Sequence, residues 1–189
     1  GARPCGTHEG FERLVEDPQA VIEYCRAIGS PYIVVPSMPS EYRGGSRARI
    51  EEFARQLDEI GTKVREAGMQ LCYHNHSFEF ETVSDGDETV WDVLFGTADP
   101  DLVKAEVDVA WVANAGLDPV EFMGRWGDRV RLLHMKDLDE ENQLAPVGTG
   151  VLDMPAVIAK GREIGVDWYI IELDRPREGK DILSEVQIA

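Results

Sequence analysis

The stretch VKAEVDVAWVANAGLDPVEFMGRWGDRVRLLHMKD, residues 103–137, holds two apolar runs separated by an amphipathic segment. The runs at 103–111 and 130–137 are rich in β-branched residues, which is typical of buried strands. The segment 118–127 begins with Asp-Pro, which is typical of a helix with a capping Asp and a Pro in its first turn. A strand, a helix and a second strand in this order predict parallel pairing.

The same alternation extends in both directions along the chain. Further strands are expected at 2–8, 32–36, 70–76 and 167–174. Further helices are expected at 17–29, 46–68, 87–96 and 153–165. About six strands, each followed by a helix or loop, predict an α/β fold with a parallel sheet covered by helices. Either a doubly wound sheet or a (β/α)₈ barrel has this pattern.

Side chains that can bind metals or carry protons fall in pairs near the ends of four of these strands. The pairs are His74 and His76, Glu106 and Asp108, His134 and Lys136, and Glu172 and Asp174. Residues two apart on a strand face the same side of the sheet. Active sites of α/β barrels are built from several strands at this end. A doubly wound sheet usually has a Gly-rich phosphate loop, and the sequence has no GxGxxG or Walker-type motif, so the (β/α)₈ TIM barrel is favoured.

Asp108, His134 and Glu172 together form a mixed nitrogen and oxygen ligand set. Such a set suits Mn²⁺, Co²⁺, Zn²⁺ or Fe²⁺ better than Ca²⁺. Each residue also has a structural alternative. Asp108 could cap the chain after its strand, and His134 could be a hydrogen-bonded core histidine. Glu172 could pair with Arg175 or Arg177.

Composition limits the classes of function. The chain of 189 residues has a net charge of −17, which repels phosphate backbones, so no nucleic-acid partner is expected. No apolar run approaches the length of a membrane span, and the N-terminal residues lack the apolar region of a signal peptide. The three cysteines are few and widely spaced, which is typical of a reducing compartment. We therefore expect a single cytoplasmic domain over residues 1–189 with no membrane partner.

Four stretches resemble the sugar phosphate isomerase/epimerase superfamily, the xylose isomerase-like TIM barrels grouped with the family-two apurinic endonucleases. They are YHNHSFEF (73–80), the segment 106–137, PVGTGVLDMPAVI (146–158) and IIELD (170–174). Residues 5–39 also look like the third and fourth βα units of that family. The resemblance implies a (β/α)₈ barrel that lacks its first two βα units in this chain. Open sheet edges in such a barrel would favour a homo-oligomer.

The resemblance also implies one divalent metal, Mn²⁺, Co²⁺, Zn²⁺ or Mg²⁺, held by four strands. Asp108, His134 and Glu172 match three of the family's ligands. His74 stands where many members have the first glutamate ligand, and Glu79 is an alternative to it. A histidine at this position would give a softer ligand set.

The implied activity is a metal-dependent isomerase or epimerase acting on a sugar or sugar phosphate. A proton would be abstracted next to a metal-bound carbonyl and hydroxyl pair. His76 and Glu172 are the acid/base candidates, and Lys136 would contact substrate oxygens. His8 and Trp111 would bind the substrate. Lys136 could instead be a solvated strand-end lysine, and Trp111 could pack against the helix layer.

Three other functions are compatible with parts of this pattern. The same site could remove water from a keto-sugar or an inosose, as dehydratases and lyases of the superfamily do. An apurinic endonuclease is disfavoured, because those sites need several metals and this chain has only 4 histidines and a net charge of −17. A truncated, non-catalytic barrel is the third possibility.

Overall fold

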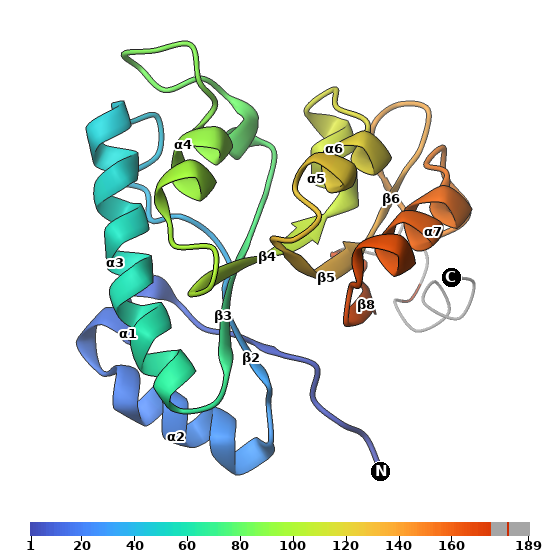
Figure 1. Cartoon of the computed structure of the whole chain (residues 1–189). Coiled ribbons are helices and arrows are strands. Elements are labelled where there is room, and N and C mark those ends of the chain that lie inside the picture. The colour runs from blue at the N-terminus through green and yellow to red at the C-terminus, as the bar shows by residue number, and fades with distance from the viewer. Residues whose placement is uncertain (175–180, 182–189) are drawn as a thin grey trace. The chain divides into compact units, whose positions relative to one another are not determined.

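The computed structural model describes residues 1–174 and 181 (Figure 1). The chain divides into two compact units, residues 1–105 and residues 106–189. In both units parallel strands alternate with helices, as the sequence predicts.

The first unit contains three parallel strands. They are β1 (Thr7–His8), β2 (Tyr32–Val35) and β3 (Gln70–His74), in that order across the sheet. Ile33 in the central strand pairs with Thr7 on one side and with Leu71 on the other. β2 and β3 are almost continuous runs of buried residues, which is the pattern of a parallel strand covered on both faces. Because the strands are parallel, the ends of β1 and β3, at His8 and His74, lie at the same edge.

The helices of the first unit cover this sheet. They are α1 (Phe11–Glu16), α2 (Pro18–Ile28), α3 (Arg47–Glu66), the 3₁₀ turn η1 (Phe78–Phe80) and α4 (Val90–Thr97). α2 begins as predicted, because the Asp17 carboxylate accepts a hydrogen bond from the N–H of Ala20. It ends at Gly29, whose φ of 75° is favourable for glycine. The short helix α1 was not predicted from the sequence.

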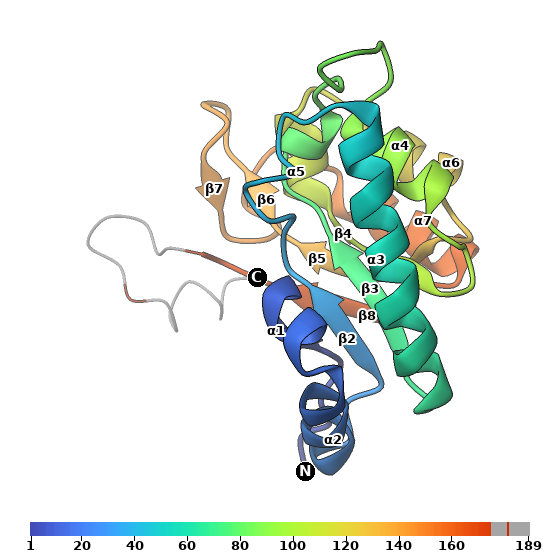
Figure 2. The ribbon, with the colours of Figure 1, turned by 90° about the vertical axis from the view of Figure 1, so that its left-hand side faces the viewer.

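The long helix α3 buries the apolar face that its sequence predicts. The buried residues of that face are Ile50, Phe53, Leu57, Ile60 and Val64. Figure 2 shows α3 lying along β3, and α4 packs against the same helix. Gly61 permits a close approach, since a Cβ there would lie 2.9 Å from the carbonyl oxygen of Leu102.

The second unit continues the alternation. Its strands are β4 (Val103–Asp108, which begins in the first unit), β5 (Val130–Met135) and β8 (Trp168–Ile171), in that order across the sheet. Its helices are α5 (Val109–Asn114), α6 (Pro119–Arg125) and α7 (Met154–Ile164). β5 and β8 are parallel, with His134 beside Ile170. α6 begins after Asp118, whose carboxylate accepts from two backbone N–H groups, as the Asp-Pro pair predicts.

The strand predicted at 103–111 is shorter than expected. β4 ends at Asp108, and residues 109–114 form the helix α5. The physical reason is the Asp108 carboxylate, which accepts hydrogen bonds from the N–H groups of Ala110 and Trp111 and so starts a helix there. Trp111 therefore lies on a helix and not on a strand.

A small hairpin after β5 was also missed. It consists of β6 (Asp137–Leu138) and β7 (Leu144–Ala145), which are antiparallel. The carboxylate of Asp137 is fully buried and accepts hydrogen bonds from four backbone N–H groups. The donors are Leu138, Gly148, Gly150 and Leu152, at 2.9 to 3.1 Å. This single side chain therefore organises the whole loop that follows the hairpin.

Within the described residues, every helix is too short or too polar to cross a membrane.

Candidate active site

Asp108 is the last residue of β4 and lies in a cluster of polar side chains in the second unit. Its side chain is fully buried. One carboxylate oxygen, Oδ1, caps α5, while the other, Oδ2, lies 3.1 Å from the Nζ atom of Lys136. Burial raises the pKa of Asp108 to about 6, although the Lys136 ammonium opposes the shift. The capping alternative is therefore correct for one oxygen, and the other oxygen remains directed at a cation.

His134 lies between two carboxylates on β5. Its Nε2 atom is 3.2 Å from Oε2 of Glu106, and its Nδ1 atom is 2.5 Å from Oε2 of Glu172. Burial alone would lower the pKa of His134, but the carboxylates of Glu106 and Glu172 raise it to about 9. In a neutral imidazole, Nε2–H donating to Glu106 leaves the Nδ1 lone pair for a metal.

Lys136 and Glu172 complete this cluster. The Lys136 side chain is buried, and its Nζ atom lies 3.0 Å from Oε2 of Glu172 and 3.0 Å from Oδ2 of Asp174. Burial opposes the charge on Lys136, but Asp108 and the neighbouring acids raise its pKa above the usual value. His134 holds the pKa of Glu172 well below its usual value. Glu172 is therefore a carboxylate throughout the neutral range.

The second unit brings together three of the residues predicted as metal ligands. Ligand atoms of Asp108, His134 and Glu172 all lie within 4.8 Å of one another. Glu106 and Asp174 add two more carboxylates, so among the described residues four acidic side chains surround two basic ones, His134 and Lys136. A divalent cation would balance this excess negative charge, and the mixed nitrogen and oxygen donors suit a transition metal. The role of the three residues as ligands stays a prediction.

The first unit brings together three histidines predicted for the site. The ring of His74 lies 5.4 Å from that of His8 and 5.2 Å from that of His76, measured between centroids. His74 is buried at the end of β3, and His76 lies in the loop after it, beside the ring of Phe78. His74 as the fourth ligand, His76 as the base and His8 as a substrate contact stay predictions.

Glu79 has both of its carboxylate oxygens engaged within the first unit. Oε1 accepts a hydrogen bond from the hydroxyl of Tyr73 at 2.6 Å, and Oε2 accepts from the backbone N–H of His76 at 2.8 Å. Glu79 is fully buried, and this burial raises its pKa to about 7. Burial likewise raises the pKa of Tyr73 well above its usual value. These contacts give Glu79 a role in fixing the loop that carries His76.

Sequence reasoning did not assign roles to Glu106 and Asp174, although it identified both as strand-end acids. The signal was their spacing, since each is two residues from a predicted ligand. Trp111, on α5, has its ring centroid 5.9 Å from Nζ of Lys136, so it borders the cluster. The alternative partners of Glu172, Arg175 and Arg177, lie outside the described residues.

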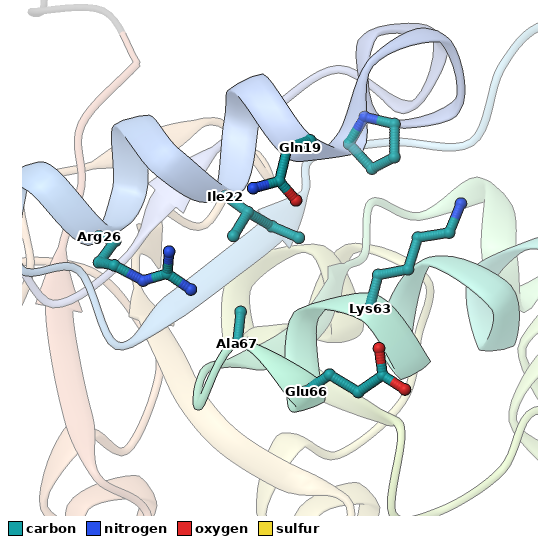
Figure 3. A pocket seen from close by; sticks show the side chains of 7 residues that line it. Gln19, Ile22, Arg26, Lys63, Glu66 and Ala67 are labelled. Carbon is teal, nitrogen blue, oxygen red and sulfur yellow. The ribbon is translucent and has the colours of Figure 1, made fainter.

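A separate hollow of about 400 Å³ lies between α2 and the end of α3 (Figure 3). Ile22 of α2 and Ala67, the residue after α3, form part of its wall, and Arg26 and Lys63 contribute charged side chains from the two helices. None of the residues predicted for the site lines this hollow. The predicted chemistry therefore lies at the strand ends and not in this groove.

A family model described as "Xylose isomerase-like TIM barrel" matches residues 4–187. The chain belongs to this family. The match confirms the fold class predicted from the strand-end pattern. The division of the chain into domains stays a prediction.

Relatives and solved structures give further comparisons. An inosose dehydratase of Lacticaseibacillus casei is 30% identical in an alignment of 146 residues that covers 66% of this chain and 47% of the relative. A sugar phosphate isomerase/epimerase of Parabacteroides distasonis has a TM-score of 0.86 at 25% identity, over 99% of this chain and 68% of that one. The IOLI protein with a binding zinc atom has a TM-score of 0.68 at 16% identity, over 98% and 70%, and so shares the fold. The chain thus spans about half the length of the curated relative.

Proposed function

We propose that the protein binds a divalent cation through Asp108, His134 and Glu172 and removes water from a polyhydroxylated ketone. The observation that supports this most directly is the cluster of three ligand atoms within 4.8 Å, with the Lys136 ammonium beside it. Removal of a proton next to a ketone needs a group that polarises the carbonyl and a base. In this proposal the cation would polarise the carbonyl, and His76 would be the base.

The donor atoms follow from the contacts. Oδ1 of Asp108 caps α5, so Oδ2, which faces Lys136, is the proposed donor to the cation. His134 would bind through Nδ1, because Glu106 faces Nε2. When bound, the cation polarises the ketone and lowers the pKa of the adjacent C–H bond. The zinc in the IOLI protein supports a metal of this kind, and Zn²⁺, Mn²⁺, Co²⁺ and Mg²⁺ are the candidates.

His74 is our proposed fourth ligand. Glu79 was the alternative, but its two oxygens already accept hydrogen bonds from Tyr73 and from His76. A ligating carboxylate would have to give up at least one of these contacts while fully buried. This cost favours His74.

The other side chains have distinct proposed roles. Lys136 would donate hydrogen bonds to a substrate oxygen and offset the negative charge that develops on it. Glu172 has a pKa held low by His134, which suits a ligand better than a base at neutral pH. His76 remains the proposed base, because histidine is the side chain that most often transfers protons in enzymes. Trp111 and His8 would contact the carbon skeleton and hydroxyl groups of the substrate.

Dehydration accounts for all the atoms without a further reactant. The C–H bond next to the ketone breaks and its proton passes to His76. A carbon–carbon double bond forms as the β C–O bond breaks, and the departing hydroxyl group leaves as water with a proton that replaces the one removed from carbon, so that His76 returns to its neutral form. The inosose dehydratase relative at 30% identity supports this outcome and a carbohydrate-like substrate.

Isomerisation or epimerisation of a sugar or sugar phosphate is the second candidate. It needs the same proton abstraction but returns the proton to carbon, so that no water is lost. The structural likeness to a sugar phosphate isomerase/epimerase, with a TM-score of 0.86, supports it.

Mass spectrometry separates the two outcomes. Metal-loaded protein would be incubated with an inosose and with a panel of keto-sugars and their phosphates. A dehydratase gives a product lighter by one water, and this is the result we expect. A product of unchanged mass in H₂O, which gains deuterium at carbon when the reaction is run in D₂O, would instead establish the isomerase or epimerase. No turnover by metal-loaded protein on any of these substrates would favour a non-catalytic barrel.

Two broader expectations stay predictions. A homo-oligomer would be seen as a larger mass in size-exclusion chromatography with light scattering. A cytoplasmic location would be seen by fractionation of the source cells.

A further inference from the structure

The ammonium group of Lys136 contacts three carboxylates that have different relations to the proposed metal. Two contacts are to Asp108 Oδ2 at 3.1 Å and Glu172 Oε2 at 3.0 Å. These oxygens belong to residues of the proposed ligand set. The third contact is to Asp174, whose two oxygens accept hydrogen bonds from Nζ at 3.0 and 3.2 Å.

A divalent cation and the Lys136 ammonium therefore compete for the same oxygens. Binding of the cation requires the carboxylates of Asp108 and Glu172 to coordinate the metal instead of pairing with Lys136. Lys136 is only 3% exposed, so its ammonium would lie next to a second cation with little hydration to stabilise its charge. Asp174 lies outside the proposed ligand set, and its contact with Lys136 can persist.

We propose that Asp174 is a positioning residue that holds the Lys136 ammonium beside the site when a divalent cation is coordinated by Asp108 and Glu172. Held there, the ammonium would donate a hydrogen bond to an oxygen of the substrate. This inference rests on the proposed function. It gives a role to Asp174, a strand-end acid that is partly exposed. In the described part of the chain, the contacts given for Asp174 link it to the predicted ligands through Lys136.

A double-mutant cycle on metal affinity tests the proposal without any need for turnover. Metal-stripped wild type, Asp174→Ala, Lys136→Met and the double variant would be titrated with Mn²⁺ in a calorimeter. Lys136→Met should bind Mn²⁺ more tightly than wild type, because the competing ammonium is gone. Asp174→Ala should bind it about fivefold more weakly, the size expected for one partly exposed ion pair.

The decisive comparison is the effect of Asp174→Ala in the Lys136→Met background. If Asp174 acts through Lys136, this second loss should disappear to within about twofold. Asp174→Glu should recover most of the wild-type affinity, because it keeps the carboxylate. An equal loss of affinity in both backgrounds would mean that Asp174 acts only through its general negative charge, and this would overturn the proposal. So would an unchanged affinity in Asp174→Ala.

Activity gives a second and separate readout. With saturating Mn²⁺, Asp174→Ala should lower kcat more than it raises KM, because the ammonium is misplaced relative to the developing charge. Coupling in the calorimeter without turnover by wild type would leave the role of Asp174 intact and contradict the proposed reaction. No Mn²⁺ binding by wild type would overturn both.

Discussion

Replacement of Glu79 by Gln should change how the stability of the protein depends on pH. Glu79 is fully buried, with one oxygen accepting from the Tyr73 hydroxyl and the other from the N–H of His76. Gln can keep both contacts, because its amide oxygen can accept from His76 and its NH₂ can donate to the Tyr73 oxygen. The substitution therefore removes the titration with little change in packing.

The magnitude follows from the pKa of Glu79. Burial raises it from 4.5 to about 7, so the folded state holds a proton that the unfolded chain would already have released. The protonated form thus contributes stability that is fully present below pH 4.5 and is lost as the pH rises to about 7. A difference of about 2.5 between the two pKa values corresponds to about 3 kcal/mol of unfolding free energy.

Urea unfolding followed by circular dichroism between pH 4.5 and 8 measures this effect. The difference in unfolding free energy between wild type and Glu79→Gln should shift by about 3 kcal/mol across that range, with wild type losing stability relative to the variant as the pH rises. Glu81→Gln, at an exposed position of the same loop, is the matched control and should show no such shift. A difference between wild type and Glu79→Gln that stays constant with pH would refute the reasoning.

Two further predictions concern the second unit. Gly150→Ala should lower the melting temperature sharply and cost roughly 3 kcal/mol, because a Cβ there would overlap the carbonyl oxygen of Leu138 and the buried carboxylate of Asp137. The control Gly96→Ala, in helix α4 with no atom near the new Cβ, should leave stability unchanged or raise it by about 0.5 kcal/mol, and equal effects of the two changes would contradict the packing argument. Metal binding at pH 7.5 should release close to one proton, because His134 has a pKa of about 9 without metal and must bind as neutral imidazole. Calorimetry in buffers of different ionisation enthalpy measures this proton, and its persistence in His134→Gln would exclude His134 as its source.

The sequence predicted the architecture because the local signals agree with the tertiary ones. The apolar face of α3 and the Asp-Pro pairs before α2 and α6 each specify an element from nearby residues alone. The predicted end of the strand at residue 111 was wrong, and the strand ends at Asp108. The reason is that a mainly apolar run such as residues 107–112 is compatible with a strand or a helix. The outcome depends on a side-chain cap that periodicity does not reveal.

The candidate site was predictable as a set of strand-end residues but not as a set of contacts. Their places near strand ends, their residue types and the family resemblance identified Asp108, His134 and Glu172, and the structure brings them together. The sequence did not indicate that Lys136 would contact three carboxylates, or that Asp137 would accept hydrogen bonds from four backbone N–H groups. The first arrangement depends on side chains from neighbouring strand ends, and the second on a loop that returns to Asp137 between 11 and 15 residues later.

Crystals grown with Mn²⁺ test the central claim most directly. Anomalous difference density should show one peak about 2.0–2.2 Å from Oδ2 of Asp108, Nδ1 of His134 and a carboxylate oxygen of Glu172. No peak at saturating Mn²⁺, or a peak that none of these three residues contacts, would contradict the proposed metal site and the reaction built on it.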